Sequence, residues 1–536
     1  MLALRGYALR AWTFIAAFSL AVANAAVPPT AECLNGTYSG VYSDGLGQDF
    51  FLGIPYLQAP VGDRRFHPAD SLVATWNGTV SATNYASSCI GYGDQGEIID
   101  PDTMAEDCLY LNIIRPHMNA TTLPSNTSNT ADSTTSLLPV LVFVHGGGFS
   151  GGSASESRYN LSFPVAQSVR IGQPVIAVSF NYRLSAWGFL YSNEIRDTGA
   201  TNTGLRDQRF ALAWIQENIA GQDAGASSVG FHLTAYAGRN DSLLRAAILQ
   251  SGNPTPTQGM NGTQYYQPLY DQLTKLVQPE PAFATEYGMA DNDTCWVSPD
   301  RMACLRNASS ASMNAAINQT NPRGWFPVID GDIVTEQPSR SLYVNKFVDV
   351  PIIIGANTDE GSYYMPSTKI TTDAEFADLV AIVKAELYQG DAAINANRRQ
   401  ACQSFAKSGN PTYCYRFDVG GLNGHAVAAH GDELPFTFYN TGALPGHSIA
   451  LHSIAKDISN SWLSFVGTLD PNAWRAFGNS GSSAVVTHTW PAYNASDPYE
   501  IVFQSHGSFI ELDDWRATQT TLIQGPPSLI AVAYQR

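Results

Sequence analysis

Three short runs of the chain are almost wholly apolar and are flanked by proline, glycine or polar residues. They cover residues 139–145, 175–180 and 246–250. A continuous apolar run of this length is typical of a strand buried on both faces, as the strands of a parallel sheet are. The three runs therefore predict three strands at the centre of a sheet.

Residues 202–220, between the second and third runs, carry apolar side chains at a helical spacing. The apolar residues that produce this pattern are Phe210, Ala211, Trp214, Ile215 and Ile219. The spacing predicts an amphipathic helix. Because strands that alternate with helices are typical of the α/β class, we expect a mixed, mostly parallel sheet flanked by helices.

The first 25 residues form a segment of a different kind. Arg5 and Arg10 precede an apolar run over residues 11–22, and the small-residue site Ala23-Asn-Ala25 follows. This three-part pattern predicts a secretory signal peptide that is removed after Ala25. The mature protein would then be secreted.

No linker rich in proline, glycine or charge divides residues 26–536, so we expect a single domain. No run there reaches 18 consecutive apolar residues, which argues against integral membrane association. The formal net charge of −17 argues against a nucleic-acid partner, because phosphate backbones are bound by an excess of Lys and Arg.

Seven cysteines become informative once the chain is expected outside the cell. Their spacing suggests three disulfides and one cysteine left over: Cys89–Cys108, Cys295–Cys304, Cys402–Cys414, and Cys33. A zinc site is the competing interpretation, but no Cys-x-x-Cys or histidine pair at ligand spacing accompanies these residues. We expect no metal.

Asn-x-Ser/Thr acceptors for N-linked glycans occur along the whole chain. The eleven acceptors are Asn35, Asn77, Asn119, Asn126, Asn160, Asn240, Asn261, Asn292, Asn307, Asn318 and Asn494. Together with a signal peptide they favour a secreted glycoprotein.

Residues 145–149 read His-Gly-Gly-Gly-Phe and follow directly on the first apolar run. Consecutive glycines let backbone N–H groups point into a cleft, which is how hydrolases bind the oxyanion of a tetrahedral intermediate. A plain turn at the end of a strand would need one glycine rather than three. The motif therefore favours acyl-transfer chemistry.

Further motifs stand in a fixed order around this one. They are Gly-Ile-Pro-Tyr at 53–56 with Arg-Phe at 65–66, Glu-Asp-Cys-Leu-Tyr-Leu-Asn at 106–112, Asn-Tyr-Arg-Leu at 181–184, Gly-Leu-Arg-Asp-Gln at 204–208, Leu-Gln-Ser-Gly at 249–252, Asn-Thr-Asp-Glu-Gly at 357–361, His-Gly-Asp-Glu at 430–433 and Trp-Pro at 490–491. With them the chain resembles the type-B carboxylesterase/lipase family, the α/β-hydrolase group that includes cholinesterases and secreted fungal lipases. The string at 106–112 is highly specific for that family.

The resemblance implies an α/β-hydrolase fold and a Ser–His–Glu triad that forms an acyl-enzyme and then hydrolyses it. Glu360 matches the acid and His430 the general base, whereas the neighbouring His425 lacks the family's context. Gly147 and Gly148 match the oxyanion-hole glycines. The resemblance also implies an ester substrate, no cofactor, and the disulfides Cys89–Cys108 and Cys295–Cys304. The pair Cys402–Cys414 rests on spacing alone.

The nucleophile itself is missing from the sequence. In the family a loop, a buried strand and the elbow Gly-x-Ser-x-Gly follow the helix that matches residues 202–220. Here Gly-Gln-Asp-Ala-Gly follows at once at residues 221–225, which leaves no room for a strand of about five residues. Aligned on the elbow, Asp223 occupies the serine position and Ala224 would donate the third oxyanion N–H. Aligned on the upstream loop, the serine lies in the lost segment.

Other serines do not replace it. Ser227 and Ser228 should lie inside the next helix, and Ser448 follows no apolar strand. Three functions remain: an ester hydrolase, with acyl transfer to a secondary metabolite as one form, whose sequence is here an incomplete gene model or splice form; a catalytically inactive binding protein; and a hydrolase that attacks non-ester electrophiles through Asp223. The retained acid, base and glycines favour the first. The short stretch between Cys89 and Cys108 has few apolar residues, which favours small or medium soluble esters over emulsified lipid.

Overall fold

The computed structural model describes residues 27–72, 74–93, 103–117, 137–219, 226–255, 260–364, 372, 390–422, 425–477, 487–518 and 520. The expected signal peptide lies outside the described residues. So do Asp223, Ala224, Asn119 and Asn126.

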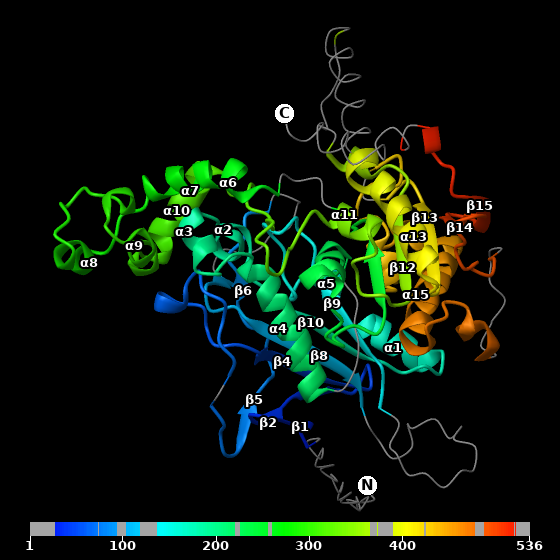
Figure 1. The fold of residues 1–536 in the computed structure, drawn as a ribbon. Coiled ribbons are helices and arrows are strands. Elements are labelled where there is room, and N and C mark those ends of the chain that lie inside the picture. The colour runs from blue at the N-terminus through cyan, green and yellow to red at the C-terminus, as the bar shows by residue number, and fades with distance from the viewer. Residues whose placement is uncertain are drawn as a thin grey trace, which may run out of the picture.

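The described strands form two five-stranded sheets, in the orders β3-β4-β8-β10-β9 and β11-β12-β13-β14-β15 (Figure 1). Their strands are β3 (Val41–Ser43), β4 (Gln48–Pro55), β8 (Tyr110–Pro116), β9 (Val140–Val144), β10 (Ile176–Phe180), β11 (Ala247–Gln250), β12 (Ile352–Asn357), β13 (Thr412–Asp418), β14 (Tyr499–Gln504) and β15 (Gly507–Leu512). A smaller sheet joins β1 (Thr30–Cys33), β2 (Gly36–Ser39) and β5 (Thr79–Ser81), and β6 (Ser88–Cys89) pairs with β7 (Met104–Ala105).

The three apolar runs form β9, β10 and β11, as the sequence predicts. Pairing is parallel between β9 and β10 and from β11 to β14, and antiparallel among β3, β4, β8 and β10 and between β14 and β15. The predominance of parallel pairs expected from the sequence therefore holds only for the second sheet. Short turns join β3 to β4 and β14 to β15, and such turns can join only antiparallel strands.

The sheet is interrupted between β9 and β11. Among the described strands, each of these two pairs on one side only. Their side chains nevertheless share both hydrophobic layers. One core cluster holds Val140, Val142, Val144, Ala247 and Leu249, and a second holds Ala246 and Ile248 with Leu141 packed against it. The two sheets thus lie within one layered core.

The helices are α1 (Ser162–Arg170), α2 (Ser185–Phe189), α3 (Asn193–Asp197), α4 (Thr203–Asn218), α5 (Ala226–Gly238), α6 (Gly262–Tyr265), α7 (Gln267–Thr274), α8 (Pro281–Glu286), α9 (Arg301–Asn307), α10 (Ser310–Thr320), α11 (Pro338–Tyr343), α13 (Ala396–Ser408), α14 (Leu434–Thr437) and α15 (Ile449–Thr468). Helix α1 packs against β8 and β10, α5 against β11, and α13 against β12 and β13. Within the described parts of the chain, no helix combines the length and apolar character needed to cross a membrane.

Helix α4 is the amphipathic helix that the sequence predicts. Ala211, Trp214 and Ile215 are buried on it, but Phe210 is among the exposed apolar residues. Successive residues on a helix point about 100° apart, so Phe210 falls at the outer edge of the apolar stripe rather than within it.

Candidate active site

The expected acid and base lie in direct contact. Nδ1 of His430 is 2.7 Å from Oε2 of Glu360, whose side chain is buried at the end of β12. The other carboxylate oxygen, Oε1, accepts a 2.6 Å hydrogen bond from the backbone N–H of Asn357. With both oxygens engaged, the carboxylate has one orientation and fixes that of the imidazole.

Two hydrogen bonds, one from the backbone and one from a side chain, join the loop that carries the acid to the loop that carries the base. Asp359 N donates to Ala428 O at 3.0 Å, and Asn357 Nδ2 donates to Ala429 O at 2.5 Å. Each of these acceptors stands one or two residues before His430. The contact between acid and base is therefore supported by two hydrogen bonds to main-chain carbonyls just before His430.

A second carboxyl group, that of Glu433, is buried beside the pair. Its Oε2 accepts a 2.7 Å hydrogen bond from Nδ2 of Asn357. Burial raises the pKa of Glu433 to about 7, and the negative charge of Glu360 adds to the rise. Burial lowers the pKa of His430, but the neighbouring carboxylate of Glu360 outweighs it, so this pKa lies above its ordinary value.

The glycine loop follows β9 directly. Gly147 has φ +114° and Gly148 has φ +59°, and backbone N–H groups of Ser150 and Gly151 both donate to Gly147 O, at 3.1 and 3.0 Å. A Cβ atom on Gly147 would clash with the carbonyl of Gly151. This tight turn is therefore open only to glycine at position 147.

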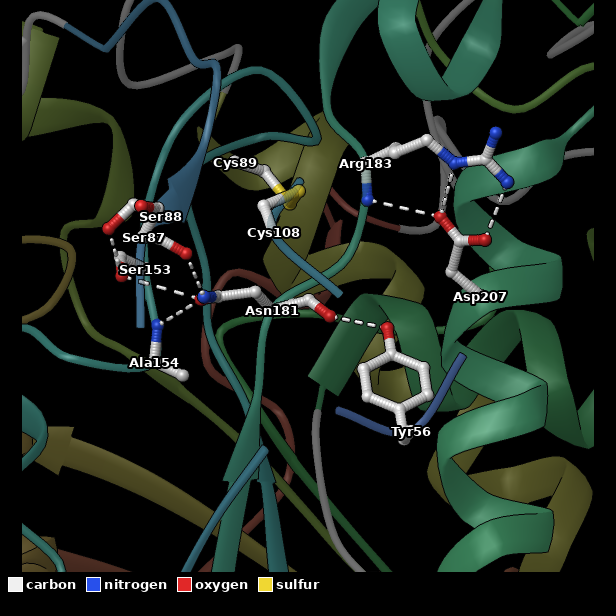
Figure 2. Close-up of a disulfide and its surroundings, with 10 residues drawn as sticks. All are labelled: Tyr56, Ser87, Ser88, Cys89, Cys108, Ser153, Ala154, Asn181, Arg183 and Asp207. Atoms are coloured by element: carbon white, nitrogen blue, oxygen red, sulfur yellow. Dashed lines mark hydrogen bonds and ion pairs between the residues drawn. A yellow bond between two sulfur atoms is a disulfide. The ribbon is translucent and has the colours of Figure 1, made fainter. Parts of the chain in front are cut away.

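Asn181 connects the segment after the glycine loop to Ser87, which stands two residues before the disulfide Cys89–Cys108 (Figure 2). Its Oδ1 accepts a 2.9 Å hydrogen bond from Ala154 N, and its Nδ2 donates to Ser87 O at 3.1 Å. Tyr56 Oη donates to the backbone O of Asn181 at 2.5 Å. The motifs at residues 53–56 and 181–184 are thus joined to each other by a buried hydrogen bond.

Arg183, in the same Asn-Tyr-Arg-Leu motif as Asn181, forms a buried ion pair with Asp207 of α4 (Figure 2). Two guanidinium nitrogens reach the two carboxylate oxygens at 2.7 and 2.6 Å. The pair fixes α4 against the segment that follows β10, and α4 is the helix that leads to residues 220–225.

The described serines that the sequence discounts as nucleophiles have structural roles. Ser227 and Ser228 lie in α5, and Ser228 Oγ accepts a 3.0 Å hydrogen bond from Gln208. Ser448 caps α15 and accepts from Leu451 N at 3.4 Å. Asp223, the alternative nucleophile, and Ala224, the alternative oxyanion donor, lie outside the described residues.

All three expected disulfides are present: Cys89–Cys108, Cys295–Cys304 and Cys402–Cys414, and Cys33 is free. Two members of the site, Asn357 and Glu433, are not predicted from the sequence. Their positions in the Asn-x-Asp-Glu-Gly and His-Gly-Asp-Glu motifs are the signal that could have identified them.

The arrangement of sheets, glycine loop and His–Glu pair is that of an α/β-hydrolase. A model of the carboxylesterase family matches residues 29–389. The chain is 31% identical over 540 aligned residues to Lipase 4 of Diutina rugosa, covering 89% of this chain and 88% of that protein. It is 33% identical over 406 residues to Lipase 1 of Geotrichum candidum, covering 66% of each. The chain belongs to the carboxylesterase family.

Solved structures show the same fold. The crystal structure of Aspergillus niger EstA superimposes with a TM-score of 0.72 at 23% identity, covering 95% of this chain and 99% of that one. A PNB esterase superimposes with a TM-score of 0.70 at 23% identity, covering 92% and 99%.

Proposed function

We propose that this protein is a secreted carboxylic-ester hydrolase that works through an acyl-enzyme, and that the segment with its nucleophilic serine is missing between residues 220 and 226. The observation that carries the proposal is the 2.7 Å contact between Nδ1 of His430 and Oε2 of Glu360. A protein retained only for binding has no need of an imidazole oriented by a buried carboxylate.

In the proposed reaction, Nε2 of His430 accepts the proton of the serine hydroxyl as this attacks the ester carbonyl. Glu360 stabilises the imidazolium that forms. Backbone N–H groups of Gly147 and Gly148 stabilise the oxyanion, and each such donor contributes about 100-fold or more to turnover. The imidazolium then protonates the leaving alcohol. His430 next activates water, which hydrolyses the acyl-enzyme.

The interrupted sheet supports a missing segment. Strand β9 leads into the glycine loop, and the second sheet carries Glu360 and His430 after β12 and β13. One further parallel strand between β9 and β11 would join the two sheets and end between the oxyanion glycines and the base. Without it, each backbone group left unpaired on a buried strand edge costs about 1–3 kcal/mol.

The test compares the chain of this sequence with a form that has a strand and Gly-x-Ser-x-Gly inserted before Ala226. The loss of a triad nucleophile costs roughly a million-fold in turnover. We therefore expect background hydrolysis of activated aryl esters from the first form, and both hydrolysis and stoichiometric organophosphate labelling from the second. The inserted form with alanine in place of its serine is the control.

Two results would contradict the proposal. Stoichiometric labelling of the unaltered chain would mean that another residue is the nucleophile, with Asp223 as the first to test on non-ester electrophiles. A folded inserted form that is neither active nor labelled would favour the binding protein.

Export and substrate size complete the proposal. Three disulfides support an oxidising compartment, as does the signal peptide that the sequence predicts at residues 1–25. Deletion of residues 2–25 should keep the protein inside an expressing cell.

For the substrate, we propose small or medium soluble esters rather than emulsified lipid. Strong activation of the inserted form at an oil–water interface would overturn this preference.

A further inference from the structure

We propose that the helical lobe, residues 260–320, carries N-linked glycans at Asn261, Asn292, Asn307 and Asn318, and that the glycan at Asn292 covers exposed apolar side chains near it. This inference rests on the export proposed above. The lobe comprises α6 to α10, and Figure 1 shows α7 to α10 on the opposite side of the molecule from β12 to β15. Glycans there would leave the Glu360–His430 pair uncovered.

All four asparagines of the lobe are exposed. Asn261 uses Oδ1 to accept from Gln264 N at 3.1 Å and so cap α6, whereas a glycan is attached through Nδ2. Nδ2 of Asn318 donates to Asn314 O at 3.1 Å. A glycosylated amide keeps one N–H, so this bond can persist. The folded lobe is therefore compatible with a glycan at each position.

The asparagines of two other sequons, Asn160 and Asn35, are instead partly buried and hydrogen-bonded to neighbouring segments. Asn160 is only partly exposed, and the hydroxyl of its sequon, Ser162 Oγ, is buried where α1 begins and donates to Oδ1 of Asn160 at 2.7 Å, so this sequon is less accessible than those of the lobe. Nδ2 of Asn35 donates to Leu72 O and Ala74 O, both at 3.1 Å, and glycosylation would remove one of the two hydrogens. We expect both asparagines to be unmodified in the folded, exported protein.

The lobe also exposes large apolar side chains on the segments that flank Asn292 in the sequence. Tyr287 is 39% exposed and Val297 is 56% exposed, five residues before and after it. The hydrogen bond from Cys295 N to Val277 O, at 2.9 Å, brings the Val297 segment beside the end of α7, where Leu276 is 37% exposed. Exposed apolar side chains that lie together promote association between molecules, and a bulky hydrophilic glycan attached between Tyr287 and Val297 would shield them.

The test starts with the full chain, including residues 1–25, expressed in a secretory yeast. Protein from the medium is deglycosylated with a peptide N-glycosidase in heavy-oxygen water, so that each glycan site is read as a mass shift from Asn to Asp. We expect the shift at Asn261, Asn292, Asn307 and Asn318 and its absence at Asn35 and Asn160.

The covering role is tested by removing one glycan in two independent ways, Asn292→Gln and Thr294→Ala. Both variants should bind more of an apolar dye and aggregate faster than the parent protein. Asn240→Gln is the matched control, because it removes an exposed sequon that has no large exposed apolar side chain within five positions, and it should change neither property. An equal rise in the control would overturn the covering role.

Exported protein that is modified at Asn494 but bare across the lobe would overturn the glycan assignment and leave the proposed export intact. So would a glycan found at Asn160 rather than on the lobe. Protein that stays inside the cell with every sequon bare would instead overturn the export, and this inference with it.

Discussion

Nδ2 of Asn357 donates a 2.7 Å hydrogen bond to Oε2 of Glu433, while the backbone N–H of the same Asn357 holds Glu360 at 2.6 Å. One residue therefore positions two buried carboxyl groups beside the imidazole of His430. The two carboxyl groups repel each other when both are ionised. Protonation of Glu433 therefore changes the net charge of the cluster formed by Glu360, His430 and Glu433.

The first prediction concerns stability against pH. The pKa of Glu433 is raised from 4.5 to about 7 in the folded state. Between these values the folded protein binds a proton that the unfolded chain releases, so this group makes stability fall as pH rises, by about 3 kcal/mol across the window. Glu433→Gln should remove that part of the pH dependence, measured as the free energy of unfolding in urea between pH 4.5 and pH 7.5. Parallel curves for parent and variant would contradict it.

The second prediction concerns the imidazole. The carboxylate of Glu360 holds the pKa of His430 above its ordinary value. Glu360→Gln keeps a hydrogen-bonding side chain but removes the charge, so the pKa of His430 should fall. NMR titration of the imidazole resonances measures this without catalytic turnover. An unchanged His430 titration would mean that Glu360 orients the ring without setting its charge.

Local patterns in the sequence predict the strands β9, β10 and β11. A continuous apolar run indicates a buried strand by itself, without knowledge of which other segments it packs against. The pairing of Glu360 with His430 is predictable through the resemblance, since each stands in a recognisable motif. The bonds from Asn357 to Glu433 and Ala429 could not be read in this way. They depend on how the loops after β12 and β13 pack, and these loops are about 70 residues apart in the chain.

The third prediction compares a buried ion pair with an exposed one. Arg183 and Asp207 are both buried, and removal of one partner leaves an uncompensated charge. Asp207→Asn should therefore cost about 3–5 kcal/mol of unfolding free energy. Asp197→Asn, which breaks the exposed pair with Arg196, is the matched control and should leave the unfolding free energy close to that of the parent, because water screens an exposed pair. Chemical denaturation of both variants measures the difference, and equal costs would contradict it.

The fourth prediction concerns the disulfide that rests on spacing alone. Cys402 in α13 and Cys414 in β13 are both fully buried and joined. Replacing both by alanine should lower the free energy of unfolding by about 2–4 kcal/mol, because the unfolded chain is no longer constrained. Cys33→Ala is the control, since Cys33 forms no disulfide in the structure. A double variant as stable as the parent would mean that the bridge contributes nothing to folding.

The last prediction separates two glycines of the oxyanion loop. A Cβ on Gly147 would meet the carbonyl of Gly151 in a backbone with φ +114°, whereas at Gly148, with φ +59°, a Cβ would meet no atom within 4 Å. Gly148→Ala should thus cost only the backbone strain, about 1–2 kcal/mol. Gly147→Ala adds the steric conflict, roughly 1–3 kcal/mol more, and the loop must open to relieve it. In the inserted, active form, Gly147→Ala should lower turnover of aryl esters more than Gly148→Ala does, because the displaced N–H groups no longer meet the oxyanion. If the two variants lose stability and turnover equally, the close approach of Gly147 to Gly151 does not shape the oxyanion site.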